Sequence, residues 1–146
     1  MANSLTNRGE QFLLEIALRG GSAITALRFG LTNAALTPTS VLTDAEASEP
    51  AVANGYARVL VTKDGTGWPT SALNAGAWML TSLDIVWTAS GGAIPDVGAT
   101  PPTFARVFLA DGAVGVGTLL IGYWDLTQTS IADSDTLTFN AKIKLT

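Results

Sequence analysis

The chain has 146 residues, a net charge of −4 and a charged fraction of 14%, and it contains neither histidine nor cysteine. These absences exclude Ser-His-Asp and Cys-His nucleophile pairs, disulfides and the usual zinc ligand sets, because each needs an imidazole or a thiolate. A hydrophobic fraction of 47% and a mean hydropathy of +0.33 favour burial of surface against copies of the chain or within a larger assembly. A compact monomer with an uncharged surface is the alternative.

One helix is predictable near the start of the chain. We predict it over residues 6–19, with Asn7 and Glu10 as a partial capping box and a Gly-Gly stop after it. Its apolar face consists of Phe12, Leu13, Ile16 and Ala17. We expect this face to cover the open end of a β domain or to dock onto a neighbouring subunit, so Phe12, Leu13 and Ile16 are candidate interface residues. The first four residues lack a basic segment followed by an apolar one, and we expect no signal peptide.

The rest of the chain predicts strands and loops. Strands are predicted over residues 24–32, 56–63, 80–88, 104–110, 117–124 and 137–146, and long loops over 33–54 and 90–102. Asp-Gly pairs at Asp64 and Asp111 indicate turns, and the last strand alternates strictly between apolar and polar residues. This pattern predicts a mostly β protein: an antiparallel, jelly-roll-like β-sandwich (22–146) preceded by one helical segment (1–21).

Two features invite a chemical interpretation. The glycine-rich run from Gly112 to Thr118 lacks the lysine of a P-loop and the third glycine of a dinucleotide fingerprint, so a hairpin loop explains it better. Carboxylates gather at Asp133 and Asp135 and again over residues 44–49. Such pairs serve as acid and base in glycosidases or bind calcium, but carboxylates that cap backbone amides in turns are the simpler interpretation. We predict no catalytic residue, no cofactor and no metal site, and therefore not an enzyme.

Four tryptophans divide into two pairs. Trp87 and Trp124 lie inside strand patterns, which predicts that they pack in the core. Trp68 and Trp78 lie in less regular sequence and are candidate interface anchors, with a sugar-stacking platform as the alternative.

The basic residues are few and scattered. The central arginines of three apolar strands (Arg28, Arg58 and Arg106) are expected on a solvated sheet face, paired with carboxylates such as Asp84 or used in subunit contacts. Nothing forms the basic cluster that nucleic-acid binding needs. The longest apolar stretch, Val114–Trp124, has about half of the ~20 residues of a membrane helix. We expect neither nucleic acid nor a membrane as partner.

Several short motifs stand in a recognisable order along the chain. They are Leu27–Thr32, the Asn-Gly-Tyr-Ala-Arg-Val strand at Asn54–Val59, Phe104–Leu109, Thr118–Gly122 and Asp133–Phe139. In this order they resemble a family of small tailed-bacteriophage virion proteins of the tail-fibre or decoration type. The resemblance implies a structural protein located in the virion after synthesis in the host cytoplasm.

The implied partners are copies of the chain itself, as a homo-oligomer, and other virion proteins of the capsid or tail. Capsid decoration, by many weak contacts acting together, is the first expectation. A tail-fibre or baseplate-associated protein that contacts host surface glycans is the alternative.

Overall fold

The computed structural model describes residues 3–19, 27–96, 98–99, 102–112 and 119–144. In chain order its elements are β1 (Asn3–Leu5), α1 (Asn7–Arg19), β2 (Leu27–Thr32), α2 (Leu42–Glu46), β3 (Val59–Val61), β4 (Thr70–Asn74), β5 (Ala77–Thr81), β6 (Ile85–Thr88), β7 (Arg106–Ala110), β8 (Leu120–Asp125), β9 (Thr136–Phe139) and β10 (Lys142–Lys144). Within these ranges neither helix combines the length and the apolar run that crossing a bilayer would require.

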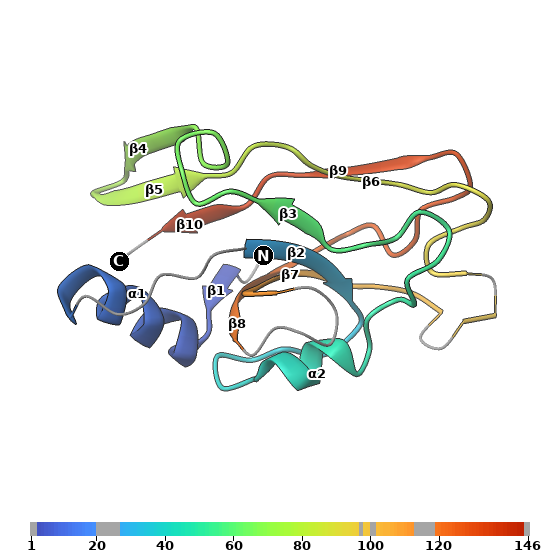
Figure 1. The fold of residues 1–146 in the computed structure, drawn as a ribbon, viewed down its shortest axis with the longest axis horizontal. Helices are drawn as coiled ribbons and strands as arrows, with labels where there is room; N and C mark the ends of the chain where they lie inside the picture. Colours follow the sequence, from blue (N-terminus) through green and yellow to red (C-terminus); the bar gives the residue numbers. More distant parts are fainter. Residues whose placement is uncertain (1–2, 20–26, 97, 100–101, 113–118, 145–146) are drawn as a thin grey trace.

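The first layer is a five-stranded antiparallel sheet in the order β1-β8-β7-β2-β3, in which β3 lies nearest the second layer in Figure 1. Its outer face carries a small apolar cluster that α2 and the preceding segment cover. The cluster consists of Leu36, Leu42, Ala45, Phe108, Ala110, Leu120 and Tyr123. The long loop predicted over 33–54 therefore contains a short helix that seals one face of the sheet.

The second layer combines the three-stranded sheet β10-β5-β4 with the two-stranded sheet β6-β9. The two sheets follow one another along a single ladder, because Thr81 pairs with Lys142 and Ile85 pairs with Phe139. Between these pairs, residues 82–84 lie opposite residues 140–141, so one strand has an extra residue. This β-bulge divides the strands predicted over 80–88 and 137–146, and it shifts by one the alternation of faces along the bulged strand.

The main core lies between the two layers. Its largest buried members come from both sheets and include Phe29, Tyr56, Trp87, Phe104 and Trp124. Each buried indole N–H has an acceptor: that of Trp87 donates to the Ala57 carbonyl at 3.1 Å, and that of Trp124 donates to the Lys142 carbonyl at 3.2 Å. The predicted core role of these two tryptophans is confirmed.

The predicted antiparallel β-sandwich with an N-terminal helix is confirmed. The jelly-roll order stays a prediction, because these strand orders do not reproduce two sheets of four strands. The helix begins one residue from where the capping pattern placed it. Thr6, and not Asn7, is the cap, since the Thr6 hydroxyl accepts the Gly9 N–H at 3.0 Å.

The N-terminal segment contains more than the predicted helix. Its first three described residues form β1, which pairs antiparallel with β8 at the edge of the five-stranded sheet. The expected boundary between segment and sandwich, at residue 21, lies outside the described residues. Because β1 is part of the sheet, α1 starts from a fixed point on the body of the sandwich.

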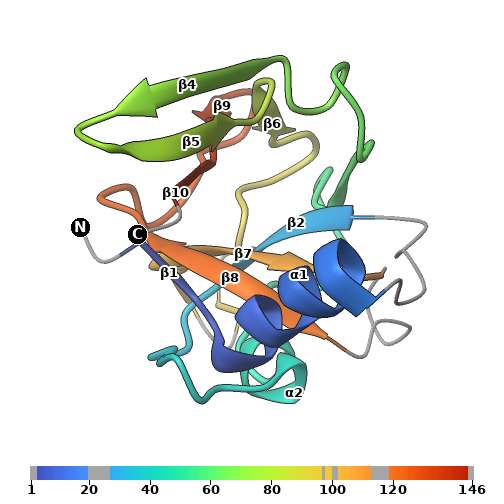
Figure 2. The same ribbon diagram turned by 90° about the vertical axis from the view of Figure 1, so that its left-hand side faces the viewer.

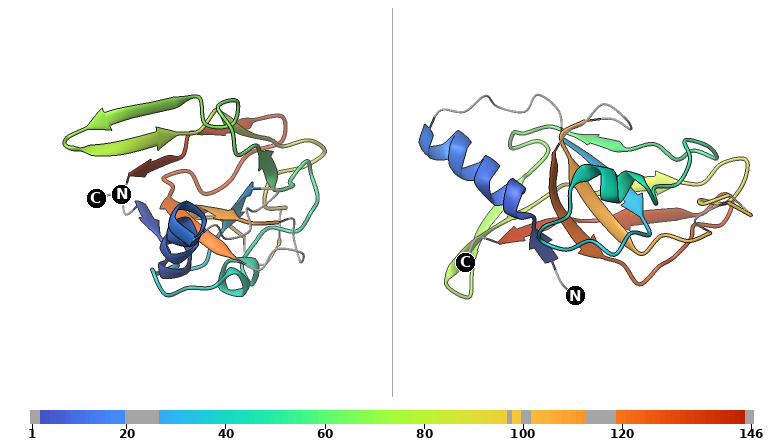
Figure 3. Two further views of the ribbon diagram at one scale, coloured as in Figure 1. Left: turned by 60° about the vertical axis from the view of Figure 1, so that its left-hand side comes forward. Right: turned by 90° about the horizontal axis from the view of Figure 1, so that it is seen from below.

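The turn at Asp64 does not close a hairpin. It leads from β3 in the first layer to β4 in the second. The hairpin that the sequence patterns missed follows directly: β4 and β5 are joined by Ala75 and Gly76, whose φ angles are 47° and 81°. Two successive residues with positive φ are typical of the two-residue turns that suit a twisted hairpin. In Figure 3 this hairpin extends beyond the rest of its layer.

Candidate functional site

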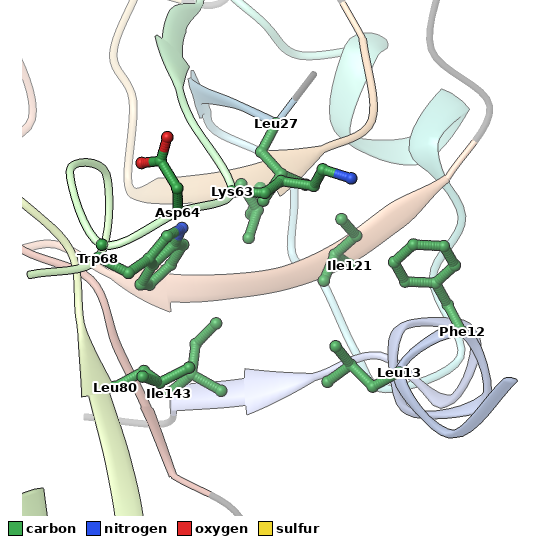
Figure 4. Close-up of a pocket in the computed structure, with 11 residues that line it drawn as sticks. Phe12, Leu13, Leu27, Lys63, Asp64, Trp68, Leu80, Ile121 and Ile143 are labelled. Atoms are coloured by element: carbon green, nitrogen blue, oxygen red, sulfur yellow. The ribbon is translucent and has the colours of Figure 1, made fainter. Parts of the chain in front are cut away.

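The described structure contains an apolar pocket of about 490 Å³ at the open end of the sandwich. We call it the end pocket. It lies between α1, the end of the five-stranded sheet and the β4-β5-β10 sheet. Figure 2 shows how these elements are arranged, seen from that side. Its lining residues are Phe12, Leu13, Leu27, Lys63, Asp64, Gly65, Trp68, Leu80, Leu109, Ile121 and Ile143. Figure 4 shows most of these side chains from the two layers and the helix converging on one space.

The helical wall of the end pocket is positioned by a close approach of α1 to β8. The Thr6 hydroxyl donates to the Leu120 carbonyl, and the Thr6 N–H donates to the Ile121 carbonyl at 3.0 Å. Gly9 lies so close to β8 that a Cβ there would collide with the Ile121 carbonyl oxygen. The first turn of the helix is therefore fixed on the sheet, and Phe12 and Leu13 on the next turn face the pocket.

The opposite wall depends on the β-bulge. Ile85 faces the core. Because successive side chains of a strand lie on opposite faces of the sheet, Leu80 would face outward if the extra residue were absent. With the bulge, Leu80 and its partner Ile143 face the pocket. Pairing in register places Leu73 opposite Trp78, on the same sheet face as Leu80. The apolar lining thus continues out of the pocket onto the hairpin, where Leu73 and Trp78 are each 64% exposed.

The floor of the pocket is aromatic and aliphatic. The Trp68 ring lies 6.2 Å from the ring of Phe29, which itself contacts Trp124 at 5.7 Å and Phe139 at 6.3 Å between centroids. These tilted and edge-on arrangements are the favourable ones for aromatic side chains. Half-buried Trp68 therefore joins the pocket to the core of the sandwich.

Lys63 and Asp64 supply the charged side chains of the pocket lining. The Asp64 carboxylate is engaged by its own turn: its Oδ1 accepts the Thr62 hydroxyl at 2.8 Å and the backbone N–H groups of Thr66 and Gly67 at 2.8 and 3.1 Å. These hydrogen bonds, that of the Thr62 hydroxyl first, lower the pKa of Asp64 below its ordinary value. A carboxylate held in its ionised form by a turn is a poor general acid at neutral pH.

Three of the five predicted interface residues meet at this site. Phe12, Leu13 and Trp68 line the end pocket, and Trp78 lies on the exposed hairpin that continues its wall. The Ile16 side chain lies outside the described part of the chain. Of the predicted helical face, Phe12 and Leu13 thus face the open end of the sandwich.

Sequence reasoning missed the contribution of Leu73, Leu80 and Ile143. The sequence signal for the hairpin that carries Leu73 and Trp78 is the Ala-Gly turn between two short uncharged strands. This signal is weak, because it lacks the Asn-Gly or Asp-Gly pair of a strong hairpin pattern. No local pattern marks the bulge that brings Leu80 to the pocket.

Two of the carboxylates singled out in the sequence, Asp133 and Asp44, accept backbone N–H groups outside the end pocket. Asp133 Oδ1 accepts the N–H groups of Gly91 and Gly92 at 3.0 and 3.2 Å, as expected of a carboxylate that caps a turn. Asp44 accepts the Val41 N–H at 2.9 Å at the start of α2. Across the described ranges no three acidic side chains gather into a metal-binding group. The glycine-rich run at residues 113–118 lies outside those ranges.

The placement of Arg58 on a solvated face was wrong. Its side chain is 1% exposed, because the segment around α2 folds over it. Its Nε and Nη2 donate to Glu49 at 2.9 and 2.6 Å, Nη2 also donates to Glu46 at 2.8 Å, and Nη1 donates to the Gly112 carbonyl at 3.0 Å. The guanidinium also lies 4.9 Å from the ring centroid of Phe108. Burial lowers the pKa of Arg58, but hydrogen bonds and charge from Glu49 and Glu46 raise it above its ordinary value.

Tyr56 belongs to the same buried cluster. Its hydroxyl donates to Glu49 at 2.6 Å and accepts the Leu31 N–H at 2.9 Å. Burial, and then the charge of Glu49, raise the pKa of Tyr56 well above its ordinary value. The carboxylates, arginine and phenol of this cluster satisfy one another, and they attach the α2 segment to the sheet.

The predictions for Arg106 and for Asp84 have different outcomes. Arg106 lies 2.8 Å from Asp125 across two neighbouring strands and donates to the Ala34 carbonyl at 2.6 Å, as expected of a cross-strand pair. Asp84 pairs with no arginine in the described structure, because its carboxylate accepts the Asn140 side-chain amide at 2.7 Å beside the bulge.

Compared with protein families and with curated protein sequences, the chain matches no family model and no curated sequence.

Proposed function

We propose that this chain is a non-catalytic assembly protein that binds other proteins through the apolar surface at the open end of its sandwich. We define this end surface by the lining of the end pocket together with Leu73 and Trp78 on the β4–β5 hairpin. The observation that carries the proposal is the exposure of these two large side chains next to an apolar pocket. Exposed apolar patches of this kind are typical of protein–protein contact sites.

The electrostatics of the end surface support the same proposal. No charged residue occurs from Gly65 to Leu83, a segment that includes Trp68 and the whole hairpin. Charged residues are depleted in the centres of protein interfaces, whereas a site for a charged substrate needs a matching charge. The buried Arg58 is paired with Glu49 and Glu46 of the α2 segment, and none of these three residues lines the end pocket.

We assign the assembly to a bacteriophage particle, with capsid decoration as the particular role. The support is the resemblance of the order of sequence motifs to that of small virion proteins, including the strand that contains Tyr56 and Arg58. A small sandwich with one apolar end suits a lattice site that repeats many times, because weak contacts add up over many copies. The partners are copies of the chain and the major capsid protein.

The second candidate is a tail-fibre or baseplate-associated protein that contacts host glycans. The exposed Trp78 favours it, since an indole at the surface can stack on a sugar ring. On this candidate, soluble glycans would compete for Trp78 and quench its fluorescence.

The abundance of the chain in purified particles separates the two roles. The stained band of the chain is compared with that of the major capsid protein, in complete particles and in heads without tails. Decoration predicts an abundance comparable with that of the capsid protein in both preparations. A small abundance that is lost with the tails would favour the tail protein, and absence from both would contradict the virion assignment.

A further inference from the structure

Strand β4 presents an open edge. It is the outer strand of the order β10-β5-β4, so among the described strands it has a neighbour on one side alone. In a hairpin with a two-residue turn the flanking residues, here Asn74 and Ala77, form a hydrogen-bonded pair, and such pairs recur at every second residue. Ser71 and Leu73 fall between them. Their N–H and C=O groups therefore point away from β5, toward the open side.

This edge lacks the features that normally prevent edge strands from pairing. Proteins blunt such edges with charged side chains, prolines or bulges. The sequence of β4, Thr-Ser-Ala-Leu-Asn, contains neither charge nor proline, and it pairs with β5 in unbroken register. The backbone edge therefore has the chemistry to accept another extended strand in antiparallel pairing.

Charge favours a second copy of the chain as the source of that strand. Two molecules of net charge −4 repel each other over most of their surfaces, but the segment from Gly65 to Leu83 carries no charge. A partner strand of opposite charge would find no carboxylate here to pair with. Beside the edge, Leu73 and Trp78 are each 64% exposed, so the sheet face next to the open edge is apolar.

We propose that two copies of the chain pair β4 with β4 in antiparallel orientation, about a twofold axis at Ala72. Ser71 of each copy then lies opposite Leu73 of the other, and each of these pairs exchanges two backbone hydrogen bonds. The result is a six-stranded sheet in the order β10-β5-β4-β4-β5-β10. Its apolar face runs without a break from Ile143 and Leu80 of one copy, through Leu73 and Trp78 of both, to Ile143 of the other.

A twofold contact of this kind is self-complementary and closed. It leaves both end pockets at the margins of the joined sheet, where they remain open to other proteins. The pairing rests on the proposed assembly function and names the partner for the hairpin part of the end surface.

Cysteine cross-linking tests the axis, because the chain has no cysteine of its own. In the Ala72→Cys variant the two cysteines form a non-hydrogen-bonded pair with Cα atoms about 4.5 Å apart, within the range of about 4.4–6.8 Å that disulfides span. The matched control is Thr70→Cys on the same strand face. Its two copies lie four residues out of step, about 14 Å apart at ~3.4 Å per residue.

Under mild oxidation we expect Ala72→Cys to give a covalent species of twice the 15.1 kDa chain mass, and Thr70→Cys to remain a single chain. Equal cross-linking of the two variants, or none in either, overturns the proposed axis.

A second test removes one backbone donor. Ser71→Pro deletes an N–H that points to the open side and leaves the bonds between β4 and β5 in place. We expect sedimentation equilibrium to give twice the chain mass for the unchanged protein and for the control Ser71→Thr, and 15.1 kDa for Ser71→Pro. An unchanged protein that sediments as a single chain, or a Ser71→Pro variant that still pairs, overturns the proposal.

The two proposals fail separately. A chain that is abundant in particles but neither cross-links nor pairs overturns β4 pairing and keeps the assembly function. A chain that pairs through β4 but is absent from particles keeps the pairing and contradicts the virion role.

Discussion

Replacing Glu49 with glutamine removes the main counter-charge of a buried arginine. The Glu49 side chain is 3% exposed, and both of its carboxylate oxygens accept hydrogen bonds from Arg58. Glutamine has almost the same size and keeps one oxygen as an acceptor for Tyr56. The change therefore removes charge with little change of packing, and the guanidinium stays buried.

The expected loss in the free energy of unfolding depends on the burial of Arg58 and on the partners that Arg58 keeps after the substitution. Breaking a buried ion pair by removing one partner costs about 3–5 kcal/mol. Glu46 still contacts Arg58 at 2.8 Å, so we expect the lower end, about 3 kcal/mol. The matched variant Glu46→Gln alters a side chain that is 22% exposed, and we expect about 1 kcal/mol, because solvent screens that pair and Glu49 stays in place. Domains have total stabilities of about 5–15 kcal/mol, so the difference is large.

Urea unfolding followed by tryptophan fluorescence measures both variants. With slopes of about 1–3 kcal/mol per molar urea, the midpoint of Glu49→Gln should fall by about 1–3 M. The midpoint of Glu46→Gln should fall by about a third of that amount, and the slopes should not change. Equal midpoints for the two variants, or a larger effect of Glu46→Gln, would refute the assignment of Glu49 as the principal partner of the buried arginine.

Three further predictions concern single groups. Gly9→Ala should lower the melting temperature despite a gain of about 1 kcal/mol in helix propensity, because its Cβ meets the β8 backbone. Gly65→Ala is the control and should leave the melting temperature unchanged, because a Cβ there meets nothing within 4 Å. Equal effects of the two variants would show that α1 is not held against β8. Tyr56→Phe should cost about 1–3 kcal/mol in urea unfolding, since it leaves a buried N–H unpaired, and a cost of a few tenths would contradict this. The pKa of Tyr56 is raised in the folded chain, so its contribution to the free energy of unfolding is complete below pH ~10. This contribution declines at higher pH, because Tyr56 ionises in the unfolded chain. The Tyr56→Phe variant should not show this decline. Because the pKa of Asp64 is lowered in the folded chain, its carboxylate stabilises the folded chain above pH ~4, and this stabilisation is lost as pH falls. The stability of Asp64→Asn should therefore fall less on acidification than that of the unchanged chain. An unchanged acid-unfolding profile would contradict the role of the turn.

Residue patterns were sufficient for the elements that depend on local sequence. The helix over Asn7–Arg19 follows from its apolar spacing and its glycine stop, and only the cap was displaced by one residue. Trp87 and Trp124 could be assigned to the core because each lies inside a predicted strand. These predictions hold because periodicity records which side of an element is buried.

Features that depend on contacts between distant segments could not be predicted in this way. Arg58 looks like a solvated residue in its own strand, and its burial depends on carboxylates from a segment that lies earlier in the chain. The bulge between Ser82 and Asp84 depends on pairing with residues 140–141. The same bulge turns Leu80 toward the end pocket, so the sequence singled out Phe12, Leu13 and Trp68 of the pocket lining but not the residues of its second wall.

The central claim is that the end surface holds the chain in its assembly. Trp78→Glu places a charge on the hairpin part of this surface, on a side chain that is 64% exposed. Val86→Glu is the matched control, because it introduces the same charge at an exposed apolar position on β6. The decisive measurement is the amount of each variant in purified particles, for chains with unchanged melting temperatures. We predict that Trp78→Glu falls by about tenfold or more, as expected when an interface anchor is lost, and that Val86→Glu is retained. Equal retention of both variants would contradict the account.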